Sequence, residues 1–139
     1  MRRLLVANRG EIAVRIVRAA RDLGIETVAV HSDADVDAPH VRLADHVVHI
    51  GPSQATKSYL VVDTLVAAAK DAGADAVHPG YGFLSERASF AAAVADAGLT
   101  FVGPDAATIE RMGDKVAARE VARDAGVPTV PGTAGGVED

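Results

Sequence analysis

The sequence contains no cysteine and no tryptophan, and aromatic residues make up only 4% of its 139 residues. The absence of cysteine excludes disulfides, thiolate nucleophiles and Cys-ligated zinc or iron–sulfur centres. Because aromatics are so few, valine, leucine, isoleucine and alanine must fill the core, and a chain of this length can bury enough surface to form one. The composition therefore predicts one compact domain with an aliphatic core.

Long apolar runs and a basic charge balance are also lacking. No window approaches the roughly 18 apolar residues of a membrane-spanning helix, and the apolar run Leu4–Ala7 is too short for a signal peptide. The net charge of −5 argues against nucleic-acid binding, because phosphate contacts require a basic face. We therefore expect a cytoplasmic protein that binds neither membranes nor nucleic acid.

Several motifs that carry chemistry are missing. Neither a Gly-x-x-x-x-Gly-Lys-Ser/Thr phosphate loop nor a Gly-x-Ser-x-Gly esterase turn occurs. The acidic residues at positions 33, 35 and 37 have the spacing of a calcium loop, but Ala38 and Ala44 replace its glycine and its glutamate. The four histidines between positions 31 and 49 lack the spacing of a zinc site. We expect no metal site here, and we interpret these histidines as structural or surface residues.

A repeated pattern predicts the fold. Segments with helical spacing end in Gly24, Gly73, Gly98 and Gly126, and a short apolar run follows each glycine. Alternating helices and strands with short connections indicate the α/β class, with a mostly parallel sheet flanked by helices. The expected strands span residues 3–7, 25–30, 46–50, 75–78 and 100–102, and the expected helices span residues 10–23, 39–44, 58–72, 85–97, 105–111 and 114–125.

Three loops follow expected strands, at residues 8–11, 31–35 and 78–86. In parallel α/β sheets, ligands bind beyond the carboxyl ends of the strands. The third loop, His78-Pro79-Gly80-Tyr81-Gly82-Phe83-Leu84-Ser85-Glu86, has glycines that permit close approach to a ligand. Tyr81 could project from it into a cleft, and Ser85 is expected to cap the next helix. A tight turn that only reverses the chain fits the same residues, and the third glycine of a dinucleotide site is missing.

Two charged features are further candidates for functional sites. Lys115, in Met112-Gly113-Asp114-Lys115, is expected to begin a helix, where the helix dipole disfavours a cation. Its spacing fits an exposed lysine better than a lysine with an anionic partner. Glu11, Arg15, Arg18 and Asp22 share one face of the first expected helix. That face is either solvated or part of a polar subunit interface.

Four stretches together resemble the start of biotin carboxylase, the subunit or domain found in acyl-CoA carboxylases and pyruvate carboxylase. They are Ala7–Ala13, Val28–Ser32, His78–Glu86 and Met112–Lys115, and the resemblance extends from Leu4 to about Gly132. It implies a Rossmann-like pre-ATP-grasp domain over residues 1–112. Residues 113–139 would be a helical connector towards an ATP-grasp domain, and the Gly-rich stretch 132–136 would be its exit linker or the start of another domain.

The resemblance also implies a function. Biotin carboxylases use MgATP and bicarbonate to carboxylate biotin on a carrier domain. By similarity, Lys115 contacts ATP, Tyr81 and Gly82 line the biotin pocket, and Arg15, Arg18 and Asp22 are candidates for a homodimer interface. The implied partners are the remainder of the biotin carboxylase domain, the biotin carboxyl carrier domain and a carboxyltransferase.

The family's catalytic and magnesium-binding residues have no counterpart in this sequence. We therefore expect that residues 1–139 contain no catalytic or metal-binding residue, hold no cofactor tightly and are inactive alone. Another ATP-grasp ligase, such as those of purine or carbamoyl phosphate synthesis, would share the fold but not the loop 78–86. A receiver-like or other stand-alone nucleotide-binding module remains a further alternative, although Asn8-Arg9-Gly10 stands where a receiver has acidic residues. The sequence does not indicate the acyl acceptor.

Overall fold

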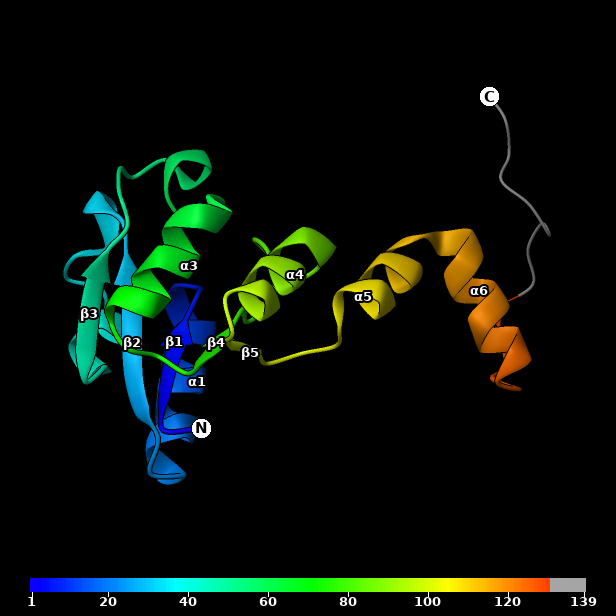
Figure 1. The fold of residues 1–139 in the computed structure, drawn as a ribbon, viewed down its shortest axis with the longest axis horizontal. Coiled ribbons are helices and arrows are strands. Elements are labelled where there is room, and N and C mark those ends of the chain that lie inside the picture. The colour runs from blue at the N-terminus through cyan, green and yellow to red at the C-terminus, as the bar shows by residue number, and fades with distance from the viewer. Residues whose placement is uncertain (131–139) are drawn as a thin grey trace.

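The computed structural model describes residues 1–130. Five parallel strands form one sheet in the order β3-β2-β1-β4-β5 (Figure 1), which confirms the predicted parallel α/β fold. The strands are β1 (Arg3–Val6), β2 (Glu26–His31), β3 (His46–His49), β4 (Ala76–His78) and β5 (Thr100–Phe101). The helices are α1 (Gly10–Asp22), α2 (Pro39–Leu43), α3 (Val62–Asp71), α4 (Ala88–Asp96), α5 (Ala106–Gly113) and α6 (Lys115–Asp124). The Gly-rich stretch 132–136 lies outside the described residues.

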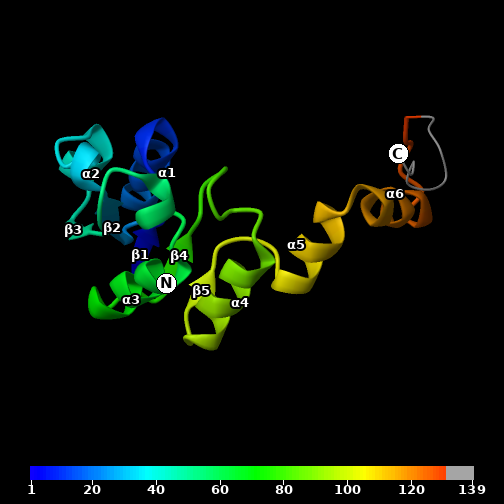
Figure 2. The ribbon, with the colours of Figure 1, turned by 90° about the horizontal axis from the view of Figure 1, so that it is seen from above.

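Helices cover both faces of the sheet. α1 and α2 lie on one face, and α3 and α4 lie on the other (Figure 2). Successive strand residues point to opposite faces, so Leu5 packs with Leu65 and Phe90 on the side of α3 and α4. Leu4 and Val6 pack against α1. Because β1 is buried on both faces, it has the continuous apolar sequence expected of an inner parallel strand.

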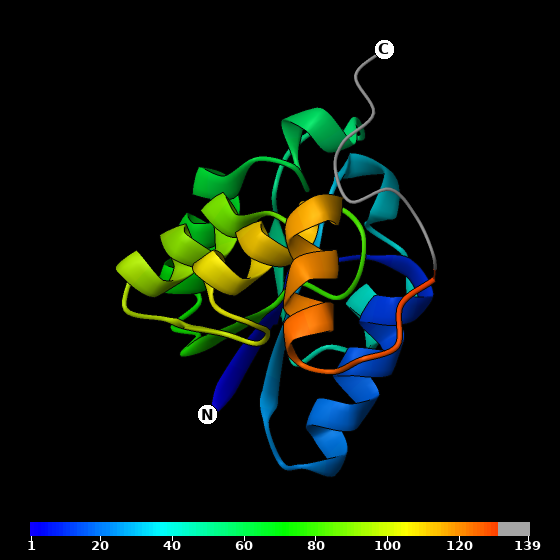
Figure 3. The ribbon, with the colours of Figure 1, turned by 90° about the vertical axis from the view of Figure 1, so that its right-hand side faces the viewer.

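Residues 103–130, here called the arm, contain α5 and α6 and extend away from the sheet (Figure 1). α5 buries Ile109 and contacts α4, whereas the described part of the chain buries no residue of α6. Figure 3 shows the arm end-on, with α6 nearest the viewer and the sheet behind it. The arm therefore packs against the domain through the contact of α5 with α4.

Two expected helices begin later than the sequence predicts. α3 starts at Val62 rather than at residue 58, because Tyr59 is fully buried in the turn that precedes the helix. α4 starts at Ala88, so Ser85 is not its N-cap, contrary to the prediction. The N–H of Ser85 instead donates to the Gly82 carbonyl at 2.9 Å, closing a turn. Phe83 has a φ of 44° at this turn, and it directs its ring into the protein rather than along a helix.

Candidate functional site

The strand order reverses beside β1. From β1 the chain builds β2 and β3 on one side, and β4 and β5 lie on the other side. Such a switch point opens a crevice at the carboxyl ends of the two strands that flank it. Residues 8–11 follow β1, and residues 78–86, here called the glycine loop, follow β4. The N–H of Ala7 donates to the His78 carbonyl at 2.9 Å, so the two loops leave the sheet side by side.

Asn8 connects these two loops. Its side chain is 3% exposed, and its Nδ2 donates to the carbonyl oxygens of Pro79 at 2.7 Å and Tyr81 at 2.8 Å. Its Oδ1 accepts the N–H of Arg9 at 2.9 Å. Since all three contacts involve main-chain atoms, the amide of Asn8 holds the backbone of the glycine loop against the start of α1.

Tyr81 projects from the glycine loop, as the sequence predicts. Its side chain is 61% exposed, and its phenol donates to the carboxylate of Glu11 in the first turn of α1. This hydrogen bond raises the pKa of the Tyr81 phenol, because the nearby carboxylate favours the protonated form. Gly82, the other residue assigned to a biotin pocket, is exposed beside Tyr81 with a φ of 66°. An apolar ring and a bare stretch of backbone thus face solvent together at the switch point.

The inner side of the glycine loop packs on a cluster that joins all three candidate loops. Phe83 stacks on Tyr59, with ring centroids 5.1 Å apart, and the Arg9 guanidinium lies 5.3 Å from the Tyr59 centroid. A nitrogen of Arg9 lies 3.2 Å from a carboxylate oxygen of Asp35. The same oxygen accepts hydrogen bonds from the hydroxyls of Ser32 at 2.7 Å and Tyr59 at 2.9 Å. We call these five residues the switch-point cluster.

The switch-point cluster determines the charge states of its members. Burial alone would raise the pKa of Asp35, but hydrogen bonds from Ser32, Tyr59 and Arg9 outweigh burial and lower it. Burial and the Asp35 carboxylate raise the pKa of the Tyr59 phenol. At neutral pH, Asp35 is therefore an anion that faces the Arg9 cation, and Tyr59 is a neutral donor between them.

No sequence pattern indicates that Tyr59 and Phe83 belong to the site. Tyr59 falls inside the helix expected from residue 58, whereas α3 begins at Val62. Arg9 and Asp35 did belong to candidate loops, yet nothing in their spacing indicated that they pair, since they are 26 positions apart. One available signal was composition, because Tyr59 is one of only two tyrosines in the chain.

The side chain of His78 forms a hydrogen bond with the main chain at the start of the glycine loop. Its Nδ1 accepts the N–H of Gly80 at 3.0 Å, so the neutral ring carries its proton on Nε2. Burial lowers the pKa of His78, because a charged imidazole loses hydration there. The ring thus remains neutral near physiological pH and keeps accepting from the loop.

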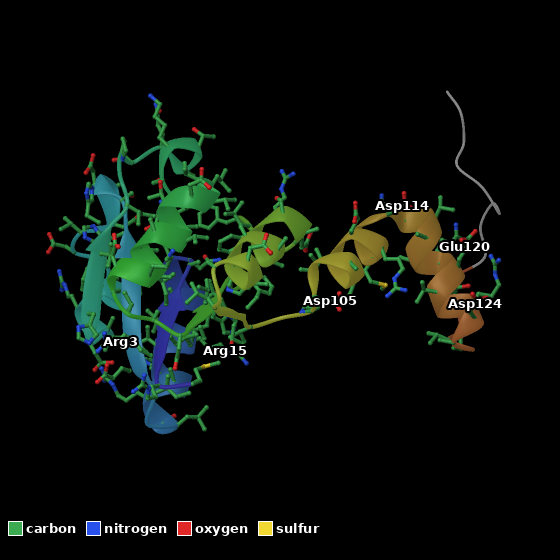
Figure 4. The ribbon with its side chains drawn as sticks, viewed as in Figure 1. Arg3, Arg15, Asp105, Asp114, Glu120 and Asp124 are labelled. Atoms are coloured by element: carbon green, nitrogen blue, oxygen red, sulfur yellow. The ribbon has the colours of Figure 1, made fainter. Side chains whose placement is uncertain are left out.

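Lys115 lies apart from the glycine loop. It is the first residue of α6, whose N-cap Asp114 accepts the N–H groups of Val116 and Ala117 at 2.8 Å each. Its side chain is exposed, and it forms no ion pair with any of residues 1–130. Figure 4 shows the neighbouring Asp114 on the arm, away from Arg15 of α1. The described residues alone therefore do not bring Lys115 close to Tyr81 and Gly82, the other candidate ligand contacts.

The charged face of α1 is exposed along its length. Arg15, Arg18 and Asp22 form no ion pair within the described range 1–130. The expected interface candidates thus share an accessible surface, and their charges remain available to a partner.

No group of three or more His, Cys, Asp or Glu side chains within residues 1–130 could hold a metal ion. None of the helices in that range is both long and apolar enough to cross a membrane.

A parallel sheet with helices on both faces, and with ligand-accessible loops at its switch point, defines a Rossmann-like α/β domain. The family model described as "Biotin carboxylase, N-terminal domain" matches residues 1–109. The chain belongs to this family. The match covers most of the sequence and includes both loops that meet at Asn8.

Curated relatives extend the match. The biotin carboxylase of Haemophilus influenzae is 55% identical over 139 residues, which is 100% of this chain and 31% of the relative. The propionyl-CoA carboxylase alpha chain of Ruegeria pomeroyi is 54% identical over 137 residues, or 99% of this chain and 20% of the relative. The chain thus spans about a third or less of the length of these relatives.

Solved structures agree with the family. The biotin carboxylase domain of a single-chain bacterial carboxylase has a TM-score of 0.90 and 50% identity, covering 98% of this chain and 31% of that one. The biotin carboxylase domain dimer of Hydrogenobacter thermophilus 2-oxoglutarate carboxylase, in complex with MgADP, ADP and bicarbonate, has a TM-score of 0.92 and 46% identity. The latter match covers 99% of this chain and 30% of that one.

Proposed function

We propose that residues 1–139 form the amino-terminal part of a biotin carboxylase that uses MgATP and bicarbonate to carboxylate carrier-bound biotin. The observation that carries this proposal is the position of the glycine loop. It lies at the switch point of a chain that is 55% identical to a biotin carboxylase over all of its residues. The complex of the 2-oxoglutarate carboxylase domain with MgADP and bicarbonate supports the same choice of substrates.

The proposed biotin pocket uses Tyr81 and Gly82 as one wall. The Tyr81 ring offers an apolar surface to a ureido ring, and Gly82 allows the ligand to approach the backbone closely. These groups bind and orient biotin, and neither carries a group that could activate bicarbonate. We therefore propose that the catalytic groups belong to another part of the enzyme.

The proposed ATP contact is Lys115 at the start of the arm. An exposed ammonium without a partner among residues 1–130 fits a role as counter-charge for ATP phosphates. The described residues supply no cluster of side chains for Mg²⁺, so other parts of the enzyme would hold the ion that assists phosphoryl transfer. Under this proposal, residues 1–112 are the biotin carboxylase N-terminal domain and residues 113–139 connect it to the ATP-grasp domain.

The proposed assembly is a homodimer through the charged face of α1. A two-fold interface brings the same surface of each subunit together, and Arg15, Arg18 and Asp22 supply charges of both signs on one such surface. The related 2-oxoglutarate carboxylase domain is described as a dimer. A biotin carboxyl carrier domain and a carboxyltransferase are the further proposed partners.

A chimera tests the proposed function. Residues 1–139 would replace the matching 139 residues of the H. influenzae biotin carboxylase. We expect the chimera to cleave ATP only when bicarbonate and free biotin are present, and residues 1–139 alone to cleave none. The Tyr81→Ala chimera should have a raised KM for biotin, whereas Val47→Ala, on the exposed edge strand β3, is the control. A folded chimera without biotin-dependent ATP cleavage would overturn the proposal, and ATP cleavage by residues 1–139 alone would contradict the proposed inactivity of the segment.

The role of Lys115 has its own test in the same chimera. Lys115→Ala should weaken ATP binding by about 1.5–3 kcal/mol, because it removes one charge-assisted contact. Binding would be measured by calorimetry with a non-hydrolysable ATP analogue, and Lys70→Ala, an exposed lysine in the last turn of α3, is the matched control. An unchanged affinity in Lys115→Ala would remove this residue from the ATP site.

A further inference from the structure

The side chain of Asn8 is buried yet makes all of its contacts with main-chain atoms. Its Nδ2 donates one hydrogen to the Pro79 carbonyl at 2.7 Å and the other to the Tyr81 carbonyl at 2.8 Å. An aspartate here would place a carboxylate against two carbonyl oxygens, and a glutamine would extend the amide by one methylene into filled space. The amide of asparagine therefore matches this position in both shape and hydrogen bonding.

The glycine loop is folded closely around this amide. Gly80 lies between the two accepting carbonyls with a φ of 66°, and a Cβ at this position would be 2.8 Å from Asn8 Nδ2. Gly82 has the same φ, but a Cβ there would have no neighbour within 4 Å. The two glycines therefore have different roles, and of the two only Gly80 lies against Asn8.

Tyr81 is held at two points by the loop that follows β1. Asn8 binds its main-chain carbonyl, and Glu11, three residues further along, accepts a hydrogen bond from its phenol. A tyrosine side chain that is 61% exposed would otherwise sample several rotamers. The contact with Asn8 fixes the main chain at Tyr81, and the contact with Glu11 selects one orientation of the ring.

We infer that Asn8 and Glu11 are positioning residues for biotin, acting through Tyr81 rather than by touching the substrate. The inference rests on the proposed function, in which Tyr81 lines the biotin pocket. Asn8 determines where the loop lies, and Glu11 determines where the Tyr81 ring points. Preorganising the ring lowers the cost of ordering it when biotin binds.

Steady-state kinetics of the chimera test this inference. Asn8→Asp should raise the KM for free biotin at least about tenfold, while the KM for ATP and the rate at saturating biotin change less than about twofold. A general loss of structure would instead affect both substrates and lower the thermal unfolding temperature. Asn8→Asp raising both KM values equally would contradict the positioning role.

A double-mutant cycle decides the question without disturbing the core. Glu11 is exposed, so Glu11→Ala should fold, and we expect it to raise the biotin KM about three- to fivefold. In the Tyr81→Phe background, where the phenol is already missing, Glu11→Ala should change the biotin KM by less than about 1.5-fold. Asp63→Ala is the matched control, because Asp63 is also an exposed acidic residue in the first turn of a helix.

The outcomes separate this inference from the proposed function. A parent chimera without biotin-dependent ATP cleavage overturns both. If the parent is active and Glu11→Ala leaves the biotin KM unchanged, or changes it equally with and without the phenol, only the positioning role is overturned.

Discussion

The switch-point site and the arm each contain candidate ligand residues, but they differ in how the surrounding chain holds them. At the switch point, Tyr81 is bound by Asn8 and Glu11, and the loop beneath it packs on Arg9 and Tyr59. On the arm, Lys115 is exposed at the start of α6, and no residue of this helix is buried within the described part of the chain. The domain thus holds the proposed biotin contact Tyr81 in place, whereas the described residues do not hold the proposed ATP contact Lys115.

This difference shows which candidate residues the described part of the chain can orient by itself. Hydrogen bonds from Asn8 and Glu11 fix the main chain and the ring of Tyr81, the proposed wall of the biotin pocket. Under the proposed function, Lys115 on its exposed helix would contact an anion that other parts of the enzyme bind. Substitutions at the switch point should therefore change the free energy of unfolding, whereas substitutions on the arm should change it little.

The largest effect is expected for Gly80→Ala, which would strain the glycine loop against Asn8. A non-glycine residue at positive φ costs about 1–2 kcal/mol, and the close approach of the new Cβ to Asn8 adds about 1–3 kcal/mol. We expect a total loss of about 3 kcal/mol in the free energy of unfolding, measured by urea denaturation. Gly82→Ala is the matched control, with the same φ, open space around it and an expected loss of about 1 kcal/mol. Equal losses at the two glycines would mean that Asn8 does not hold the loop.

Arg9→Met should have the next largest effect. Methionine keeps the length of the apolar stem but removes the cation over Tyr59 and leaves Asp35 without its counter-charge. We expect a loss of about 2 kcal/mol in urea denaturation, from a charge-assisted hydrogen bond and a cation–π contact. Arg42→Met is the control, because its ion pair with Asp37 is exposed and should contribute less than about 0.5 kcal/mol. Similar losses for the two arginines would contradict a special role for the cluster.

Much of this architecture could be predicted from the sequence because it depends on local patterns. Continuous apolar runs identified the inner strands, and alternation with helices identified the parallel sheet. The three loops at the strand ends were predicted as well, since the carboxyl ends of parallel strands share one edge. The sequence also assigned Lys115 to the first turn of a helix, where the structure places it.

The contacts inside the site could not be predicted in the same way. Tyr59 and Phe83 stack across 24 positions of sequence, and the helices expected from residues 58 and 85 begin only at Val62 and Ala88. Tertiary packing explains both later starts. Tyr59 is buried in the turn before α3, and the inward turn at Phe83 precedes α4. No spacing rule pairs Arg9 with Asp35, because their contact forms only once β1 and β2 lie side by side in the sheet.

Lower pH should weaken the sheet before it affects the arm, since all five histidines lie at or before position 78. Burial lowers the pKa of His40, whose Nδ1 has no hydrogen-bond partner among the described residues. Burial also lowers the pKa of His78. The unfolded chain then binds protons more readily than the folded chain, so stability is full above about pH 6.5 and falls as the pH decreases below it.

We expect the free energy of unfolding to fall by up to about 1.4 kcal/mol per pH unit for each such histidine. Urea denaturation at several pH values between about 7.5 and 5 would measure this slope. His40→Asn should lose the contribution of one titrating group, although it lowers stability at every pH. A slope that His40→Asn leaves unchanged would show that His40 is not responsible.

The smallest effects are expected at the start of α6. Asp114→Ala removes an N-cap that accepts two N–H groups, which costs about 1 kcal/mol and should increase amide hydrogen exchange in residues 115–124 about fivefold. Lys115→Ala should change that exchange by less than about 0.5 kcal/mol, or slow it slightly, because a cation opposes the helix dipole there. Asp105→Ala, which removes the N-cap of α5, should act on α5 instead. If Lys115→Ala destabilised α6 as much as Asp114→Ala does, Lys115 would have a structural role in the arm. The contrast between Tyr81, which residues of the domain hold in place, and Lys115, which has no structural role in the arm, would then fail.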